Sequence, residues 1–438
     1  MTPGGPLVRA GRSLGGRFTP PGDKSITHRA ILFGLLADGE TRIRGANPGE
    51  DCARSLAATA AMGAGVRRER GETIVRGTGP GRRAGGGTID CGNSGTTLRL
   101  LAGIAAARNG ESVLDGDASL RRRPMARVIE PLERMGARVS ADGGRPPLRV
   151  QGAALRGIAW DVPVASAQVA TCVLLAGLSA SGPTTVTLPG PARDHTERML
   201  PAFGVPLHVT ALPGGGRRVA LEPAVPRGAS LTVPGDFSAA AFALAAGAAH
   251  PGAEVTAVGV NLNPTRTGLL DVLAAMGAGI EVRNRREEAG EPAGDVTVRG
   301  PERLSAFDVP PEWVPRLVDE VPAWAVAASA AAGVSRVTGA AELRVKESDR
   351  IAVLARNLAR LGLRVRELPD GLEIEGGVPR GGIVEADLDH RIVMAFAALA
   401  TRADGPVGFD DASSVATSYP GFWADLAGLG AEVEGVPA

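Results

Sequence analysis

Apolar and polar positions follow two periods that alternate along the chain. Apolar runs long enough for buried helices end in a short turn containing glycine, and an alternating, strand-like segment follows. The intervals between these turn glycines are 71, 72, 70, 81 and 72 residues, at positions Gly39, Gly110, Gly182, Gly252, Gly333 and Gly405. A period of this kind indicates one structural unit present in several copies.

A second marker, a helix end followed by glycine and another alternating strand, has the same period. It occurs at Gly63, Gly136, Gly204, Gly277, Gly362 and Gly430. The two markers together predict six copies of a unit with two helices and several strands, and therefore an α/β fold. We assign the one longer interval to the charged segment 283–291 and predict that it is a surface loop.

The chain of 438 residues is long enough for two or three domains. Six copies divide naturally into three and three. We predict a first domain over residues 20–235 and a second over residues 1–19 and 236–438. The hinge crossings are expected near 19–21 and 227–238.

Charge and composition exclude several classes of protein. A net charge of +1 is too small for a chain that coats nucleic acid, whose phosphates require a basic excess. No apolar run is long enough to cross a bilayer, and no targeting segment is visible, so we predict no membrane partner. The three cysteines have neither disulfide nor zinc spacing, which fits a cytoplasmic location.

Polar residues precede the first apolar helix of each copy. These segments are 23–25, 93–97, 166–168, 235–238, 319–320 and 389–391. Any one of them is explained by helix capping, but parallel helices would gather their N-terminal ends on one face, where free amides favour anions. Cations are concentrated in the same segments: Lys24, Arg29, Arg99, Arg123, Arg193, Lys346, Arg350 and Arg391. We therefore expect one or two small polyanions as ligands.

The use of lysine points to proton transfer. The chain has 46 Arg but only 2 Lys, Lys24 and Lys346, and both lie within polar clusters. A lysine can give up its proton when desolvated, whereas arginine stays charged. Asp319 and Glu347 are the neighbouring candidate acids or bases. Because no metal-ligand spacing, nucleophile elbow or phosphate-binding lysine loop occurs, we expect chemistry without a metal or cofactor.

The polar segments resemble the signature segments of the 5-enolpyruvylshikimate-3-phosphate synthase family. The most specific are Pro21-Gly22-Asp23-Lys24-Ser25-Ile26-Thr27-His28-Arg29 and Leu343-Arg344-Val345-Lys346-Glu347-Ser348-Asp349-Arg350. The others, in family order, are 92–97, 123–125, 166–168, 193–197, 234–236 and 389–391. The resemblance covers essentially the whole chain. It implies a two-domain inside-out α/β barrel of six βαβαββ units, three in each domain.

The resemblance also implies the sixth step of the shikimate pathway, in aromatic amino acid biosynthesis. The 5-hydroxyl of shikimate 3-phosphate would attack phosphoenolpyruvate, and phosphate would then leave. The implied catalytic residues are Lys24, Asp319 and Glu347. Those implied for shikimate 3-phosphate are Lys24, Ser25, Arg29, Ser166, Gln168, Arg193, Asp319 and Lys346. Those implied for phosphoenolpyruvate are Lys24, Gly95, Arg123, Gln168, Arg350 and Arg391.

Four positions depart from the family pattern: Thr27, Ala170, Glu342 and Thr417 stand where Ser, Lys, Asn and Lys are common. The Ser166-Ala167-Gln168 segment is similar to a bacterial subgroup with Ser-Ala-Gln. Gly95 would leave room for the herbicide glyphosate, so the resemblance implies a sensitive enzyme. We expect a monomer.

Two alternatives stay open at this stage. A related enolpyruvyl transferase acts on UDP-N-acetylglucosamine and uses a reactive loop cysteine, for which Cys91 is the only candidate here. The chain could also be an anion-binding scaffold that has lost catalysis. Phosphate release with each substrate distinguishes all three hypotheses.

Overall fold

The computed structural model describes residues 5–11, 13–80 and 87–436. This part of the chain folds into two compact units, each with its own apolar core. The N-terminal unit comprises Gly22–Pro234 together with Glu287–Glu291. The C-terminal unit comprises the described residues up to Pro21, then Gly235–Arg286 and those from Pro292 onward. The predicted domains also span residues 1–4, 12, 81–86 and 437–438, which lie outside the described residues.

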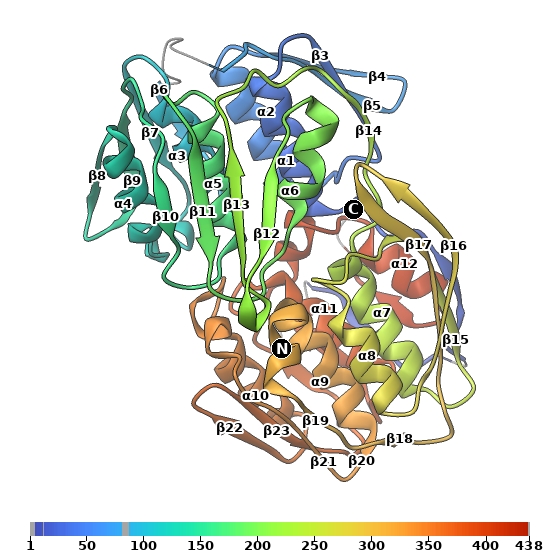
Figure 1. The fold of residues 1–438 in the computed structure, drawn as a ribbon. Helices are drawn as coiled ribbons and strands as arrows, with labels where there is room; N and C mark the ends of the chain where they lie inside the picture. Colours follow the sequence, from blue (N-terminus) through green and yellow to red (C-terminus); the bar gives the residue numbers. More distant parts are fainter. Residues whose placement is uncertain (1–4, 12, 81–86, 437–438) are drawn as a thin grey trace. The chain divides into compact units, whose positions relative to one another are not determined.

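Both units mix helices and strands, as Figure 1 shows, so the predicted α/β class is confirmed. The strands of the described residues form six open four-stranded sheets and one two-stranded sheet. In each four-stranded sheet one pair of neighbouring strands is parallel. This repeated pattern requires a crossover connection for the parallel pair and allows short hairpins for the others.

The N-terminal unit contains three of the four-stranded sheets. In spatial order, the strands of the first sheet are β14 (Ser230–Thr232), β3 (Glu40–Arg44), β5 (Glu72–Arg76) and β4 (Gly65–Glu69). Those of the second sheet are β6 (Gly87–Asp90), β7 (Glu111–Asp115), β9 (Arg145–Gln151) and β8 (Arg138–Asp142). Those of the third sheet are β10 (Ala159–Asp161), β11 (Thr184–Leu188), β13 (Arg217–Leu221) and β12 (His208–Ala211). Because β14 pairs with β3, the last strand of this unit completes its first sheet.

The C-terminal unit contains the other sheets. In spatial order, the strands of one sheet are β24 (Gly382–Val384), β25 (Val407–Phe409), β1 (Leu7–Arg9) and β26 (Glu432–Glu434), and those of the next are β16 (Gly279–Glu288), β17 (Glu291–Arg299), β15 (Glu254–Asn261) and β2 (Gly16–Phe18). A third sheet contains β19 (Asp308–Val309), β21 (Val334–Val337), β23 (Gly371–Glu375) and β22 (Val365–Leu368). The two-stranded sheet contains β18 (Leu304–Ser305) and β20 (Ala331–Ala332). The first strand of the chain thus lies between two strands from its end.

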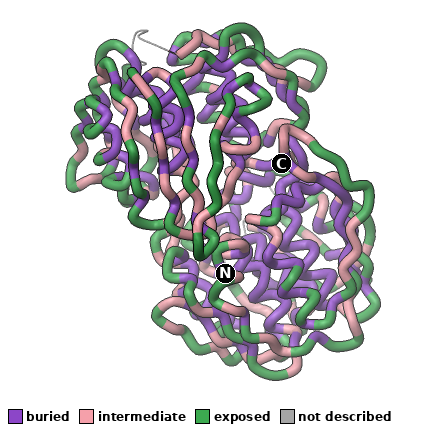
Figure 2. The backbone as a smooth tube through the Cα atoms, viewed as in Figure 1, coloured by how far each residue is buried: buried purple, intermediate pink, exposed green. Residues whose placement is uncertain are grey.

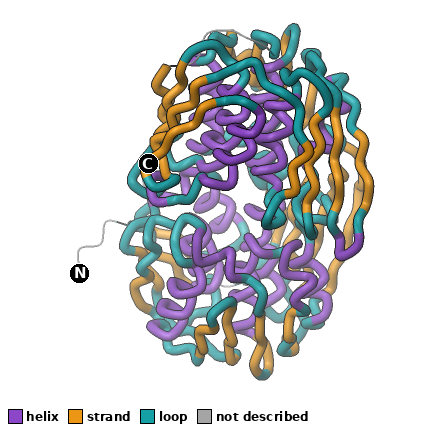
Figure 3. The backbone as a smooth tube through the Cα atoms, turned by 60° about the vertical axis from the view of Figure 1, so that its left-hand side comes forward, coloured by secondary structure: helices purple, strands orange, loops and turns teal. Residues whose placement is uncertain are grey.

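Three helices in each unit are apolar on nearly all sides. They are α1 (Lys24–Leu36), α3 (Gly95–Ala106) and α5 (Ala167–Gly177) in the N-terminal unit, and α7 (Phe237–Ala249), α9 (Val321–Ala330) and α11 (His390–Ala400) in the C-terminal unit. A helix that is apolar all round must be surrounded by protein. Figure 2 shows the interior helices of each unit as buried, and Figure 3 shows strands flanking them.

The other helices each present one apolar face to these central helices or to a sheet. They are α2 (Glu50–Ala61), α4 (Ala126–Met135), α6 (His195–Met199), α8 (Gly268–Ala275), α10 (Arg350–Arg360) and α12 (Phe422–Gly428). Short 3₁₀ turns precede two of the helices: Val318–Glu320 lies before α9 and Ala341–Val345 before α10. No helix among the described residues is long and apolar enough to cross a membrane.

The marker glycines have the backbone conformation that their pattern implies. Eleven of the twelve have positive φ, for example 96° at Gly39 and 115° at Gly136; Gly405 is the exception. A side chain is strained in this region, so glycine is the residue that ends these helices cleanly.

The prediction of a surface loop over 283–291 is wrong. Strand β16 continues to Glu288 and β17 begins at Glu291, so the segment is the end of a hairpin. Most of this part of β16 is exposed, which allows charged residues at successive positions and hides the alternation expected of a strand. The last residue, Glu291, is fully buried.

Close packing of α3 against α5 depends on Gly103. A Cβ at this position would lie 2.2 Å from the backbone oxygen of Cys172 in α5. Gly103→Ala should therefore force the two helices apart and destabilise the protein by about 1–3 kcal/mol, measured as a lower thermal unfolding midpoint. Gly428→Ala is the control, because a Cβ at this exposed helical position meets no atom within 4 Å. An unchanged midpoint for Gly103→Ala would contradict the packing argument.

Candidate active site

The first turns of the central helices of the N-terminal unit are closed by polar side chains. Asp23 Oδ1 accepts from the Ile26 amide at 2.9 Å at the start of α1. Ser94 and Ser166 cap α3 and α5 in the same way. These caps satisfy amides that have no partner within the helix.

Hydrogen bonds between side chains bring these helix ends together. Lys24, the first residue of α1, donates to Asp51 Oδ2 in the first turn of α2 at 3.0 Å. Gln168, near the start of α5, accepts from Arg99 at 2.8 Å and donates to Thr96 at 2.9 Å, both in α3. The expectation that helix N-termini gather on one face is confirmed within this unit. Their amides and dipoles favour an anion there.

Arg29 is buried under this face and held by neutral oxygens. Its Nε donates to Thr196 at 2.8 Å, Nη2 to Thr171 at 3.0 Å and Nη1 to the Ser25 carbonyl at 3.0 Å. Burial lowers its pKa to about 10. These bonds use three of the five N–H groups of a guanidinium, so two remain for an anion.

The segment that carries Arg193 is held by another arginine. Arg217 on β13 donates to the carbonyls of Ala192 and Arg193, each at 2.8 Å, and to Glu197 at 2.7 Å. Burial raises the pKa of Glu197. Arg217 thus holds the loop before α6 through the backbone carbonyls of the loop. The charge of Arg193 is close enough to Arg29 to lower the pKa of Arg29.

Gly95 leaves space for two guanidinium groups at the start of α3. An added Cβ would lie 2.9 Å from Arg99 Nη1 and 3.2 Å from Arg123 Nη1. Arg123 is held through Nη2, which donates to Asn93 at 2.5 Å. The other terminal nitrogen of Arg123, Nη1, therefore faces the first turn of α3.

The C-terminal unit has similar caps on two of its central helices. Asp236 and Asp389 accept from backbone amides at the starts of α7 and α11. The acidic pair Asp319 and Glu320 differs from the expected cap, because no side chain caps α9. A 3₁₀ turn precedes α9 instead, and Glu320 accepts from Ser238 of α7.

Arg350 is the buried centre of a carboxylate cluster in the C-terminal unit. Its Nε donates to Asp389 at 2.8 Å and its Nη2 to Glu347 at 2.7 Å. Nη1 lies 3.5 Å from Asp319 Oδ1. Burial disfavours the charge, but Asp389, Glu347 and Asp319 outweigh it and raise the pKa of Arg350 above its ordinary value.

The remaining cations of this unit surround Asp319. Lys346 lies 3.5 Å from Asp319 and donates to Glu342 at 3.0 Å. Arg391 donates to the Asp319 backbone carbonyl at 2.7 Å. Every cation of this cluster therefore has a carboxylate or carbonyl partner. An anion that binds Arg350 or Lys346 must therefore compete with carboxylates, unlike an anion that binds Arg29.

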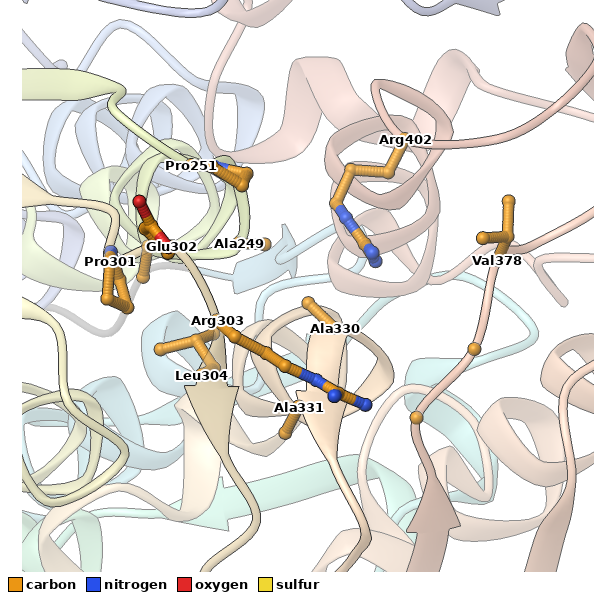
Figure 4. A pocket seen from close by; sticks show the side chains of 13 residues that line it. Ala249, Pro251, Pro301, Glu302, Arg303, Leu304, Ala330, Ala331, Val378 and Arg402 are labelled. Carbon is orange, nitrogen blue, oxygen red and sulfur yellow. The ribbon is translucent and has the colours of Figure 1, made fainter.

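Figure 4 shows a different hollow in the C-terminal unit, with a volume of about 260 Å³. Arg303 and Arg402 point into it, beside the last residues of α7 and α9. The candidate residues lie at the opposite ends of these helices, about 15 Å away for a ten-residue helix. Helix C-termini are negative and favour cations, and Arg303 and Arg402 lie at two of them, away from the candidate residues.

The structure adds residues that the sequence did not single out. Asp51 pairs with Lys24, and Thr171 and Thr196 hold Arg29. Asp51 looks like an ordinary acidic residue in a first helical turn. Thr171 lies inside an apolar run, so the pattern gave no signal for it, whereas Thr196 lies in the signature segment 193–197 but was assigned no role.

Comparisons with known proteins agree over almost the whole chain. The sequence model of a family described as EPSP synthase (3-phosphoshikimate 1-carboxyvinyltransferase) matches residues 8–426. A protein of that activity name from Synechococcus sp. (strain WH7803) is 51% identical over 433 residues, covering 96% of this chain and 97% of its own. One from Anaeromyxobacter sp. (strain Fw109-5) is 52% identical over 420 residues, covering 95% and 96%.

Solved structures give the same result. The structure of an EPSP synthase from Acinetobacter baumannii has a TM-score of 0.86 and 41% identity to this chain. The match covers 98% of this chain and 100% of that one.

His28 should make the stability of the protein depend on pH. Burial, then the charges of Lys24 and Arg29, lower its pKa well below the ordinary value. Below about pH 6.5 the unfolded chain takes up a proton that the folded protein excludes, so folding stability is lost as the pH falls. At pH 5.5 the loss from this residue is about 1.4 kcal/mol.

His28→Gln removes this proton while its amide can still bond to Ser55, the partner of His28 Nδ1 at 2.8 Å. Its unfolding midpoint should fall less than that of the wild type between pH 7.5 and 5.5. The exposed His208 provides the matched control, His208→Gln. Equal pH slopes for wild type and His28→Gln would contradict the prediction.

Proposed function

The chain belongs to the EPSP synthase family, and we propose that it transfers the enolpyruvyl group of phosphoenolpyruvate to the 5-hydroxyl of shikimate 3-phosphate. The observation that supports this most strongly is the identity of about half of all residues with named relatives over nearly the full length. The reaction belongs to aromatic amino acid biosynthesis.

The reaction is an addition followed by an elimination. The 5-hydroxyl oxygen forms a bond to C2 of phosphoenolpyruvate, its proton is lost to a base, and C3 gains a proton. C3 then gives up a proton, the bond between C2 and the phosphate oxygen breaks, and phosphate leaves. Each half needs a proton donor and a proton acceptor within reach of the substrates.

We assign shikimate 3-phosphate chiefly to the N-terminal unit. Arg29, Arg193 and Lys24 supply positive charge, and Ser25, Ser166 and Gln168 supply neutral polar groups at helix starts. Arg29 is suited to an anion because its present partners are neutral, so no carboxylate has to be displaced. Asp319 and Lys346 of the C-terminal unit complete the set.

We assign phosphoenolpyruvate to Arg123, Arg350 and Arg391, with Gly95, Gln168 and Lys24. Gly95 matters because it keeps space open beside the Arg123 guanidinium. Planar guanidinium groups bind carboxylate and phosphate oxygens in pairs, which fits this substrate.

Proton transfer is assigned to Lys24, Asp319 and Glu347. Lys24 lies 3.0 Å from Asp51, a carboxylate that can hold the ammonium in place. Asp319 and Glu347 both lie beside Arg350, and Asp319 also lies beside Lys346. Cations at this range favour ionised carboxylates, which can then accept a proton.

We further propose that each four-stranded sheet with its helices is one of six βαβαββ units. Three such units around three buried helices would give the inside-out barrel, and the two units of the structure would be the two domains. The Ser166-Ala167-Gln168 segment supports placement in the bacterial Ser-Ala-Gln subgroup. Since one chain contains all the assigned residues, we propose that it acts as a monomer.

The chemistry of Cys91 disfavours the related transferase that acts on UDP-N-acetylglucosamine. Burial, then Asp90 and Asp115, raise the pKa of its thiol to about 12. A thiol needs a lowered pKa to react readily. We therefore expect no alkylation of Cys91 by fosfomycin.

Phosphate release tests the proposal directly. The purified protein is supplied with phosphoenolpyruvate and either shikimate 3-phosphate or UDP-N-acetylglucosamine, in the presence of EDTA. Release only with shikimate 3-phosphate is expected. Release only with the nucleotide sugar would replace the proposal, and release with neither would favour a binding scaffold.

Lys24→Arg should lose most turnover although the positive charge is kept. A guanidinium cannot readily give up a proton, so kcat should fall by about 10²–10⁴-fold if Lys24 transfers one. Calorimetric titration of the variant with shikimate 3-phosphate serves as the control for substrate binding and folding. Turnover close to that of the wild type would refute the proton-transfer role.

Gly95→Ala should weaken binding of phosphoenolpyruvate selectively. The added methyl displaces the ends of Arg99 and Arg123, while the backbone needs no change. The KM for phosphoenolpyruvate should rise about tenfold, a loss of about 1.4 kcal/mol, and that for shikimate 3-phosphate should rise less, because only Gln168, through Arg99, links Gly95 to that substrate. Inhibition by glyphosate should weaken in parallel. Equal effects on both substrates would show that the site has a different occupant.

A further inference from the structure

Glu291, at the start of strand β17, is a buried carboxylate with no role in the proposed reaction. Its side chain is 0% exposed, and its Oε1 lies 2.7 Å from Nδ1 of His195, which is also 0% exposed. The two residues are 96 positions apart in the chain. A carboxylate buried in this way is costly unless other groups compensate it, so the position calls for a physical reason.

The turn before Glu291 is fitted closely to helix α6. Ala289 and Gly290 have positive φ, of 53° and 77°. A Cβ on Gly290 would lie 2.4 Å from the backbone oxygen of Arg198, in the same helix as His195. Glu291 Oε2 also lies 3.9 Å from Arg198 Nε. The turn thus packs against α6 through both its backbone conformation and its side-chain contacts.

The first turn of α6 connects this contact to the candidate substrate site. Thr196 follows His195 directly, and its Oγ1 accepts from Arg29 Nε at 2.8 Å. Thr196 Oγ1 also bonds to Thr171 Oγ1 at 2.6 Å, and Thr171 accepts from Arg29 Nη2 at 3.0 Å. A shift of His195 would therefore move the oxygens that orient the Arg29 guanidinium.

The charge of Glu291 also acts on Arg29. Glu291 is among the carboxylates whose charges support the Arg29 cation against its burial and against Arg193. The carboxylate thus lies within electrostatic range of Arg29, and its hydrogen bond is made to His195 of α6.

We propose that Glu291 is a positioning residue for binding of shikimate 3-phosphate. Through its hydrogen bond to His195 it fixes the first turn of α6, and so orients Arg29. The hydrogen bond carries the effect, since a negative charge near the cluster would not by itself attract an anion. This inference rests on the proposed function.

The test compares Glu291→Ala, which removes the hydrogen bond, with Glu291→Gln, which can keep it. Glu287→Gln is the matched control, because Glu287 is exposed in the same hairpin. For Glu291→Ala the KM and the calorimetric Kd for shikimate 3-phosphate should rise about tenfold, as expected for loss of one hydrogen bond that orients a charged group. Its KM for phosphoenolpyruvate should change less than twofold, and Glu291→Gln should restore most of the binding.

A purely structural role predicts another pattern. Both KM values would then change together with kcat, in proportion to the loss of thermal stability, and glutamine would give no selective rescue. If Glu291→Ala does not fold, His195→Phe removes the same hydrogen bond while keeping a ring, and should show the same selective loss. Unchanged shikimate 3-phosphate binding in a folded variant would overturn the inference.

Measurements on the wild type distinguish failure of the proposed function from failure of the proposed role of Glu291. If the wild type releases no phosphate with shikimate 3-phosphate, the proposed function fails, whatever the variants do. If it does release phosphate, the ratio of variant to wild-type binding tests the role of Glu291 alone.

Discussion

The amides at the first turns of six buried helices have no partners within the helix, and the rest of the site depends on how they are satisfied. Asp23, Ser94, Ser166, Asp236 and Asp389 accept from five of these turns. A polar cap at the end of a buried helix leaves neighbouring amides and a positive dipole end close together. Charged side chains can be held there at lower cost than elsewhere in an apolar core.

Arg29 in the N-terminal unit and Arg350 in the C-terminal unit are both buried, but different kinds of partner hold them. Arg29 is held by hydroxyls and a carbonyl, and burial lowers its pKa. Arg350 is held by carboxylates, which raise its pKa. The first arrangement keeps positive charge available for an anion, whereas the second brings acids beside cations. Both arrangements fit the proposed reaction, which must hold two phosphorylated substrates and move protons.

A second recurrent feature is a glycine that allows neighbouring groups to approach the backbone closely. Gly103 allows α3 to pack on α5, and Gly95 leaves space for two guanidinium groups at the start of the same helix. Gly290 lets the hairpin turn lie on α6. In each case the absence of a side chain allows a helix, a guanidinium group or a turn to lie closer to the glycine backbone than a Cβ atom would permit.

The sequence by itself determined the α/β class, the period of about seventy residues and the polar segments at helix starts, because glycine turns and polar caps at helix ends depend mainly on the local backbone. It also placed Lys24, Arg29 and Arg350 in candidate sites. It could not show Asp51, Thr171 or the role of Glu291, nor that 283–291 continues a hairpin. Those depend on contacts between residues far apart in the chain, and only the tertiary structure decided which buried charge meets which partner.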